Sequence, residues 1–251
     1  MTLPRDILGA RAKIGVLVPF TNTIVQPEFE AMAPPGVTNH VARIPNQPRP
    51  MDDMVAYAVM LAEGAVGMED VLDRITPAAP DLILLGHSVD SFLGGMAGAA
   101  ALQESLSAHA KRPVLVPSLA LVAALEALGR SRRLGVLTPY MPPADVEVRN
   151  FLTDAGFEVV RLTGLKCRTP LAIAATTQGE IRAALTALDG ADIDALVQAG
   201  TNLPMASLAA AAEAFLGKPV VSINTATYWH GLRTLGIEDR MHGFGALMAE
   251  H

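Results

Sequence analysis

The feature that most constrains the fold of this chain is an internal repeat. Residues 13–19 (KIGVLVP) and 133–139 (RLGVLTP) carry glycine, valine, leucine and proline in the same register. Two further pairs follow in the same order: DLILLGHS from Asp81 resembles DALVQAGT from Asp194, and RPVLVPS from Arg112 resembles KPVVSIN from Lys218. Because the three pairs keep one order along the chain, the sequence predicts a duplicated structural unit.

The repeated segments are short apolar runs, and helical patterns separate them. Apolar residues recur at helical spacing over the ranges 24–32, 55–75, 97–110, 119–128, 178–188 and 207–216. Strands that alternate with helices are typical of βαβ units and parallel sheets. We therefore expect an α/β fold of two pseudo-symmetric parallel-sheet lobes, with residues 1–116 plus 223–251 in the first and 117–222 in the second. Since no long Gly, Ser or Pro-rich linker divides the chain, the lobes should pack closely.

Composition excludes several classes of protein. The net charge of −6 argues against nucleic acid or an anionic membrane surface as a partner. The single cysteine, Cys167, excludes an intramolecular disulfide and a thiolate metal cluster, and the histidines show no ligand spacing. The N-terminal residues lack a signal-peptide pattern, and no apolar run is long enough for a membrane span. We expect a cytoplasmic protein that acts on small molecules and holds no metal.

The turns after the expected strands are the candidate binding site, because ligands of open parallel sheets collect beyond the carboxyl ends of the strands. These turns are rich in Ser, Thr and Asn. Such residues also cap helices, so ordinary capping remains an alternative for each of them. The turns occupy residues 19–23, 86–91, 117–118, 138–140, 200–202 and 222–225.

His87 stands where one buried strand ends, in the stretch DLILLGHSVDSF. An imidazole titrates near neutral pH and therefore suits a general acid or base. The alternative is a histidine held by hydrogen bonds in the core or at a helix cap. Asp90, three residues later, would either orient the imidazole or simply favour the first turn of a helix.

Five segments, in order along nearly the whole chain, resemble one branch of a known superfamily. They are VPFTNTIVQPEF (18–29), HSVDSFLGG (87–95), LTPY (137–140), GTNLP (200–204) and GKPVVSINTATYW (217–229). They resemble the maleate cis-trans isomerases and arylmalonate decarboxylases of the aspartate/glutamate racemase superfamily. The resemblance implies an Asp/Glu racemase-like fold with the active site in the interlobe cleft, a small carboxylic acid as substrate, no metal or organic cofactor, and a homo-oligomer, either dimer or tetramer.

This chain departs from that family at its reactive positions. The resemblance places the two family cysteines at His87 and Gly200, so neither thiol is present. Racemisation needs an acid or base on each face of the substrate carbon, and a cysteine-based isomerase needs a thiolate nucleophile. Glycine supplies neither, so we expect one-sided chemistry from His87. We also expect Gly200 to leave space opposite His87 for a bulkier substrate or a water molecule.

The resemblance also assigns the remaining site residues. Tyr140 would hydrogen-bond the ligand and join His87 as a catalytic residue, and the polar loops would hold a carboxylate through backbone N–H groups, hydroxyls and amides. Ordinary turn and cap chemistry remains the alternative for these loops, and we expect Glu28 and Glu30 on solvated surfaces. The expected substrate-binding residues are Thr21, Asn22, Ser88, Asp90, Ser91, Gly200, Thr201 and Asn202.

Taken together, the residues and the resemblance favour a cofactor-independent isomerase or lyase, decarboxylase-like, in which His87 transfers a proton on one face. Two alternatives stay open. One is a hydrolase or hydratase in which His87 activates a water molecule. The other is a non-catalytic carboxylate-binding protein that kept the loops and lost both nucleophiles.

Overall fold

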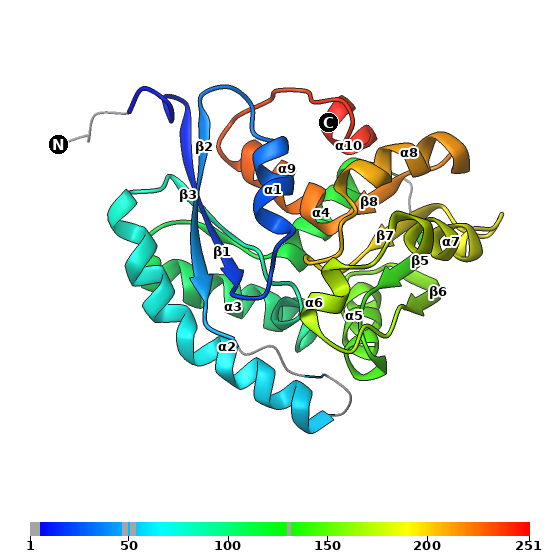
Figure 1. The fold of residues 1–251 in the computed structure, drawn as a ribbon. Coiled ribbons are helices and arrows are strands. Elements are labelled where there is room, and N and C mark those ends of the chain that lie inside the picture. The colour runs from blue at the N-terminus through cyan, green and yellow to red at the C-terminus, as the bar shows by residue number, and fades with distance from the viewer. Residues whose placement is uncertain (1–5, 47–49, 51–53, 130–131) are drawn as a thin grey trace.

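The computed structural model describes residues 6–46, 50, 54–129 and 132–251 (Figure 1). Its strands are β1 (Ala12–Pro19), β2 (Val37–Ile44), β3 (Leu82–Leu85), β4 (Val114–Leu115), β5 (Arg133–Thr138), β6 (Glu158–Gly164), β7 (Ala195–Gln198) and β8 (Val220–Ser222). Its α-helices are α1 (Val25–Ala31), α2 (Met54–Ile75), α3 (Gly95–Ala110), α4 (Pro117–Ala127), α5 (Pro142–Asp154), α6 (Pro170–Ala174), α7 (Gln178–Leu188), α8 (Ala206–Leu216), α9 (Ile223–Thr234) and α10 (Ala246–Glu250). Two short 3₁₀ helices, η1 (Thr76–Ala78) and η2 (Asp90–Phe92), complete the described elements.

The described strands form two parallel sheets with the same topology, ordered β2-β1-β3-β4 and β6-β5-β7-β8. The three repeated segments of the sequence become β1 and β5, β3 and β7, and β4 and β8, which hold equivalent places in the two sheets. The predicted duplication and the α/β fold are therefore confirmed. The fourth pair, β2 and β6, was not predicted, because these edge strands are only partly buried and mix polar with apolar residues.

An aspartate at the start of the third strand repeats the symmetry at the level of single hydrogen bonds. The Asp81 carboxylate accepts from the Lys13 backbone N–H at 2.9 Å, and Asp194 accepts from the Arg133 N–H at 2.8 Å. In return, the backbone N–H groups of Asp81 and Asp194 donate to the carbonyls of Lys13 and Arg133. Each lobe therefore sets the register of its two central strands with the same device.

The helices agree with the apolar spacing, with small differences at their ends. Helix α7 covers the expected residues, whereas α4 begins at Pro117 rather than at residue 119. Proline is favoured in the first turn of a helix, because its missing N–H would have no intrahelical partner there. The short α6, which also begins with a proline, was not predicted because five residues are too few for a periodic pattern.

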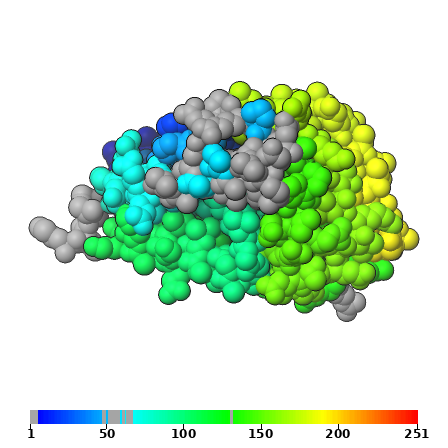
Figure 2. Space-filling view, turned by 90° about the horizontal axis from the view of Figure 1, so that it is seen from below, coloured from blue at the N-terminus to red at the C-terminus, as the bar shows by residue number. Residues whose placement is uncertain are grey.

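The two sheets share one apolar core. Leu84 of β3 and Val197 of β7 belong to the same cluster of buried side chains, so the expectation of close packing is confirmed. Helices α4 and α9 pack against each other, α9 also contacts β3, and α4 also contacts β8. We propose on this basis that the lobes exchange these helices, with boundaries near residues 116 and 222. In Figure 2, residues up to about 110 fill one side of the visible face and residues from about 135 to about 200 the other.

No helix among the described residues combines the length and the apolar character that a bilayer span requires.

Candidate active site

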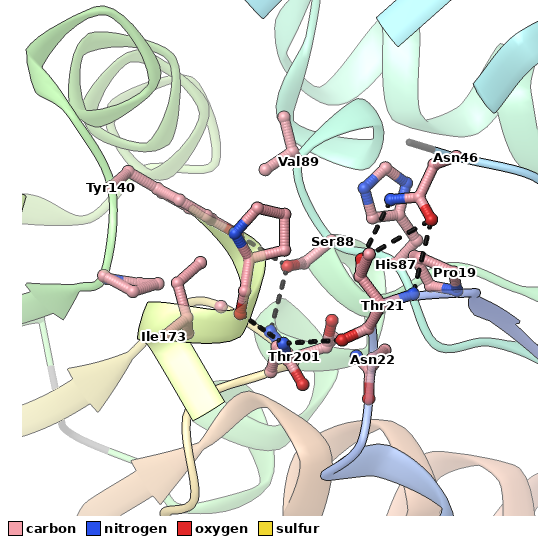
Figure 3. Close-up of a pocket in the computed structure, with 14 residues that line it drawn as sticks. Pro19, Thr21, Asn22, Asn46, His87, Ser88, Val89, Tyr140, Ile173 and Thr201 are labelled. Carbon is pink, nitrogen blue, oxygen red and sulfur yellow. Dashed lines mark hydrogen bonds between the residues drawn. The ribbon is translucent and has the colours of Figure 1, made fainter. Parts of the chain in front are cut away.

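A pocket lies where the carboxyl ends of the strands of both sheets meet (Figure 3). Its cavity volume of about 50 Å³ is several times the roughly 10–15 Å³ that one water molecule needs, so it suits a small ligand. Asn46 and His87 lie on one side, Tyr140 and Ile173 on the other, and Ser88 between them. The lining residues are Pro19, Thr21, Asn22, Asn46, His87, Ser88, Val89, Pro139, Tyr140, Pro170, Ile173, Gly200, Thr201 and Asn202.

Eight of the ten expected site residues line this pocket, and two do not. Asp90 does not line the pocket but hydrogen-bonds His87. Ser91 does not line it either, because its hydroxyl donates to the Ser88 carbonyl at 2.7 Å and accepts from the Ser118 N–H at 3.3 Å. We therefore do not propose that Ser91 contacts the substrate directly. Its hydrogen bonds hold the turn at Ser88 in place.

His87 is held by Asp90. Its Nδ1 lies 3.0 Å from Asp90 Oδ2, and the two side chains are only 14% and 15% exposed. Burial lowers the pKa of His87, but the negative charge of Asp90 and its hydrogen bond outweigh burial and raise the pKa above the ordinary 6.5. Nε2 has no hydrogen-bond partner among the described residues. Nε2 is therefore the ring nitrogen that can exchange a proton with a ligand.

Ser88 connects the two lobes at the centre of the pocket. Its Oγ lies 2.7 Å from the Tyr140 hydroxyl and accepts from the Thr201 backbone N–H at 3.2 Å. When Tyr140 donates to Ser88, the Ser88 hydroxyl keeps its own proton for a ligand. No described residue accepts from the backbone N–H groups of Ser88 or Val89, so these two donors are also available to an anion.

Two asparagines that we expected to bind substrate form hydrogen bonds to other protein groups through their side-chain amides. Asn22 Oδ1 accepts from the backbone N–H groups of Ile24 and Val25, both at 3.0 Å, where α1 begins. Asn202 Oδ1 accepts from the Thr23 N–H at 3.0 Å, and its Nδ2 donates to the Pro170 carbonyl at 2.8 Å. The Asn22 amide therefore serves the start of α1, as the capping alternative describes, whereas the Asn202 amide links the two lobes in the pocket wall.

Gly200 does not leave the space that we expected from the missing side chain. Its φ is +135°, and a Cβ built on it would lie 2.5 Å from Cδ and 2.6 Å from Cγ of Pro139. The Gly200 carbonyl is fixed by Gln198 Nε2 at 2.7 Å. The missing side chain therefore leaves no open volume in the direction of a Cβ atom, because the ring of Pro139 occupies it.

Three pocket residues escaped the sequence reasoning, namely Asn46, Pro170 and Ile173. Asn46 follows the unpredicted edge strand β2 and donates from Nδ2 to Thr21 Oγ at 3.0 Å. Its position, a polar residue directly after a strand, is the signal that would have identified it. Pro170 and Ile173 belong to the short α6, and neither residue type marks a binding site by itself.

Comparison with known proteins agrees with this architecture. The arylmalonate decarboxylase family matches residues 52–248. A maleate isomerase of Pseudomonas putida is 29% identical over 94% of this chain and 97% of its own length, and one of Nocardia farcinica is 28% identical over 97% of each.

Solved structures of maleate isomerases and of arylmalonate decarboxylase superpose on this chain. The crystal structure of a Pseudomonas putida maleate isomerase has a TM-score of 0.87, with 25% identity over 95% of this chain and 98% of that one. A Nocardia farcinica maleate cis-trans isomerase variant, solved with a covalently bound succinylcysteine intermediate, has a TM-score of 0.86 and 26% identity over 96% and 99%. Arylmalonate decarboxylase itself shares the fold, with a TM-score of 0.74 and 21% identity over 94% and 98%.

The sequence relatives are maleate isomerases and the matching family is arylmalonate decarboxylase, so an isomerase or lyase fits this chain. The match covers most of the chain, and the sequence resemblance to this branch is confirmed. The chain belongs to the arylmalonate decarboxylase family, in the branch that it shares with the maleate isomerases.

Proposed function

We propose that this protein is a cofactor-independent enzyme that decarboxylates a small, substituted dicarboxylic acid, with His87 as the general acid on one face of the substrate. The observation that carries the proposal is the His87–Asp90 pair at the pocket wall. Isomerisation by proton transfer, also through His87, is the alternative within the same class.

The retained carboxylate would bind at Ser88 and Tyr140. The described lining residues include no lysine or arginine, so hydroxyls and backbone N–H groups must hold the negative charge. Because the Ser88 and Tyr140 hydroxyls share a hydrogen bond, one hydroxyl proton of this pair, together with the N–H groups of Ser88 and Val89, would be donated to the carboxylate. Oriented N–H groups and hydroxyls can bind an anion without a cationic side chain.

The chemical step follows from the protonation of His87. A pKa above 6.5 favours the imidazolium at neutral pH, which is the acid form. When the carbon–carbon bond to the departing carboxylate breaks, its electron pair moves to the α-carbon and is stabilised as an enediolate of the retained carboxylate. The imidazolium then gives its Nε2 proton to that carbon, carbon dioxide leaves, and solvent reprotonates the imidazole.

Decarboxylation fits this pocket better than thiol-type isomerisation does. Decarboxylation needs one proton delivered to one face, and among the described lining residues His87 has the one type of side chain that ordinarily titrates near neutral pH. Cis-trans isomerisation by addition to the alkene needs a nucleophile, and Cys167 does not line the pocket. A side chain at position 200, where the resemblance would put a second reactive group, would also collide with Pro139.

The test assays the purified protein against alkyl- and aryl-substituted malonates and maleate in D2O. We expect carbon dioxide release and a product with deuterium at the α-carbon in one enantiomer. His87→Ala should reduce turnover by about a hundredfold or more, as loss of a general acid does. His109→Ala is the matched control, because His109 pairs with Asp73 at 2.9 Å on the surface, away from the pocket.

Other outcomes separate the alternatives. Solvent oxygen-18 in the product would indicate a hydrolase or hydratase. Calorimetric binding of a carboxylate that no assay shows to be converted would indicate a carboxylate-binding protein. A racemic product, or turnover that His87→Ala leaves unchanged, would reject one-sided proton transfer from His87.

A further inference from the structure

Glu28 is a partly buried carboxylate that joins the lobes outside the pocket, and its expected place on a solvated surface was wrong. It lies on α1, which begins just after the pocket loop Thr21–Asn22. Glu28 Oε1 accepts from the backbone N–H groups of Met205 and Ala206, both at 2.9 Å, at the start of α8. Helix α8 follows the pocket loop Gly200–Asn202 of the other lobe.

The second oxygen of Glu28 reaches the same loop through Asn224. Asn224 Nδ2 donates to Glu28 Oε2 at 2.6 Å and to the Thr201 carbonyl at 2.9 Å. Both partners are acceptors, so the amide can point only its nitrogen towards them. Thr201 in turn donates its N–H to Ser88 Oγ, next to Tyr140. Glu28 therefore stands at the head of a hydrogen-bond chain that ends at the proposed carboxylate site.

N–H groups alone stabilise the charge of Glu28. No lysine, arginine or histidine of the described residues forms an ion pair with it. Burial raises the pKa of Glu28, although the hydrogen bonds from Asn224, Ala206 and Met205 lower it. Hydrogen bonds to an ionised acceptor are stronger than neutral ones, and a carboxylate is favoured at a helix N-terminus. The contact is thus well suited to hold one lobe against the other.

We propose that Glu28 is a positioning residue, which through Asn224 sets the place of Thr201 relative to Ser88 and so shapes the carboxylate site. This inference rests on the proposed function for its effect on substrate, but the positioning itself is a property of the free protein. Glu28 does not line the pocket, so any effect on substrate must pass through the residues between.

Glu28→Gln is the informative variant, because it keeps the shape and removes the charge. If the new amide oxygen faces Met205 and Ala206, its nitrogen faces Asn224 Nδ2, and two donors meet. If Asn224 turns over to correct this, its oxygen faces the Thr201 carbonyl, and two acceptors meet. If the new amide nitrogen faces Met205 and Ala206 instead, the oxygen still accepts from Asn224, but both hydrogen bonds to the start of α8 are lost. Every arrangement therefore loses at least one hydrogen bond of residue 28 or of Asn224. Glu30→Gln is the matched control, because Glu30 is exposed on the same helix and, among the residues that the structure describes, its carboxylate accepts from Gln26 alone.

The experiment measures the backbone amide resonances of Thr201 and Ser88 in the ligand-free protein by ¹H–¹⁵N NMR. We expect both to shift in Glu28→Gln and in Asn224→Ala, and to stay in place in Glu30→Gln, with a cooperative thermal unfolding transition in each variant. Unchanged Thr201 and Ser88 resonances in Glu28→Gln would overturn the proposal, whether or not any acid is turned over.

Turnover gives the second readout. For an acid that the wild type converts, KM should rise on the order of tenfold in Glu28→Gln, with a smaller change in kcat. The double variant Glu28→Gln with Asn224→Ala should lose no more than the worse single variant, because both act on one chain. Additive losses would show that Glu28 does not act through Asn224. Absence of turnover in the wild type would count against the proposed function, and the NMR result would still decide the positioning role.

Discussion

Substitution of Gly200 by alanine tests whether the fold leaves room for a side chain at this position of the pocket wall. At φ +135° a side chain costs about 1–3 kcal/mol of backbone strain, and forcing a carbon to 2.5 Å from Pro139 Cδ adds about 1–3 kcal/mol of overpacking. The sum is about 2–6 kcal/mol. For a chain of this size each kcal/mol lowers Tm by about 2–4 °C, so Gly200→Ala should lower Tm by about 4–24 °C.

Gly217→Ala is the matched control for the steric part. Gly217 also has a positive φ, +68°, but nothing lies within 4 Å of its built Cβ. Gly217→Ala should therefore destabilise the fold by only about 1–2 kcal/mol, which lowers Tm by about 2–8 °C. Thermal unfolding followed by circular dichroism measures both variants. An equal Tm for Gly200→Ala and the wild type would refute the conflict between a side chain at position 200 and Pro139, and with it this structural argument for one-sided chemistry.

Two further predictions concern ionisable groups. In Asp90→Asn, the negative charge no longer opposes the burial that lowers the pKa of His87, so that pKa should fall below 6.5. As pH rises, activity should then be lost at a lower pH than in the wild type. An imidazole NMR titration and a pH–rate profile measure this, and an unmoved pKa would contradict the role of Asp90. The hydrogen bond from the Arg133 side chain and the backbone N–H groups hold the pKa of Asp194 at about 2, below its ordinary 3.8. The stability that the ionised Asp194 contributes is complete above pH 3.8 and is lost as pH falls through about 2. The Tm difference between the wild type and Asp194→Asn should therefore shrink over that pH range. A constant difference would show that the charge of Asp194 is not responsible.

Much of the candidate site was predictable because it depends on where strands end. The turns after β1, β3, β5 and β7 meet at one edge of their sheets, so Thr21, His87, Tyr140 and Thr201 reach the pocket as expected. Asn46 was missed because its strand is an edge strand, partly exposed and without a clean apolar pattern.

The sequence by itself determined the duplicated α/β architecture, because apolar runs and helical spacing are local properties that each lobe displays twice. It also determined that no cysteine occupies position 87 or 200. Only the tertiary structure decided what the side chains do there. Contacts between residues far apart in the chain direct the Asn202 amide and the Glu28 carboxylate to the opposite lobe and place Pro139 against Gly200. Such contacts depend on how two lobes pack, and no spacing within one strand or helix encodes them.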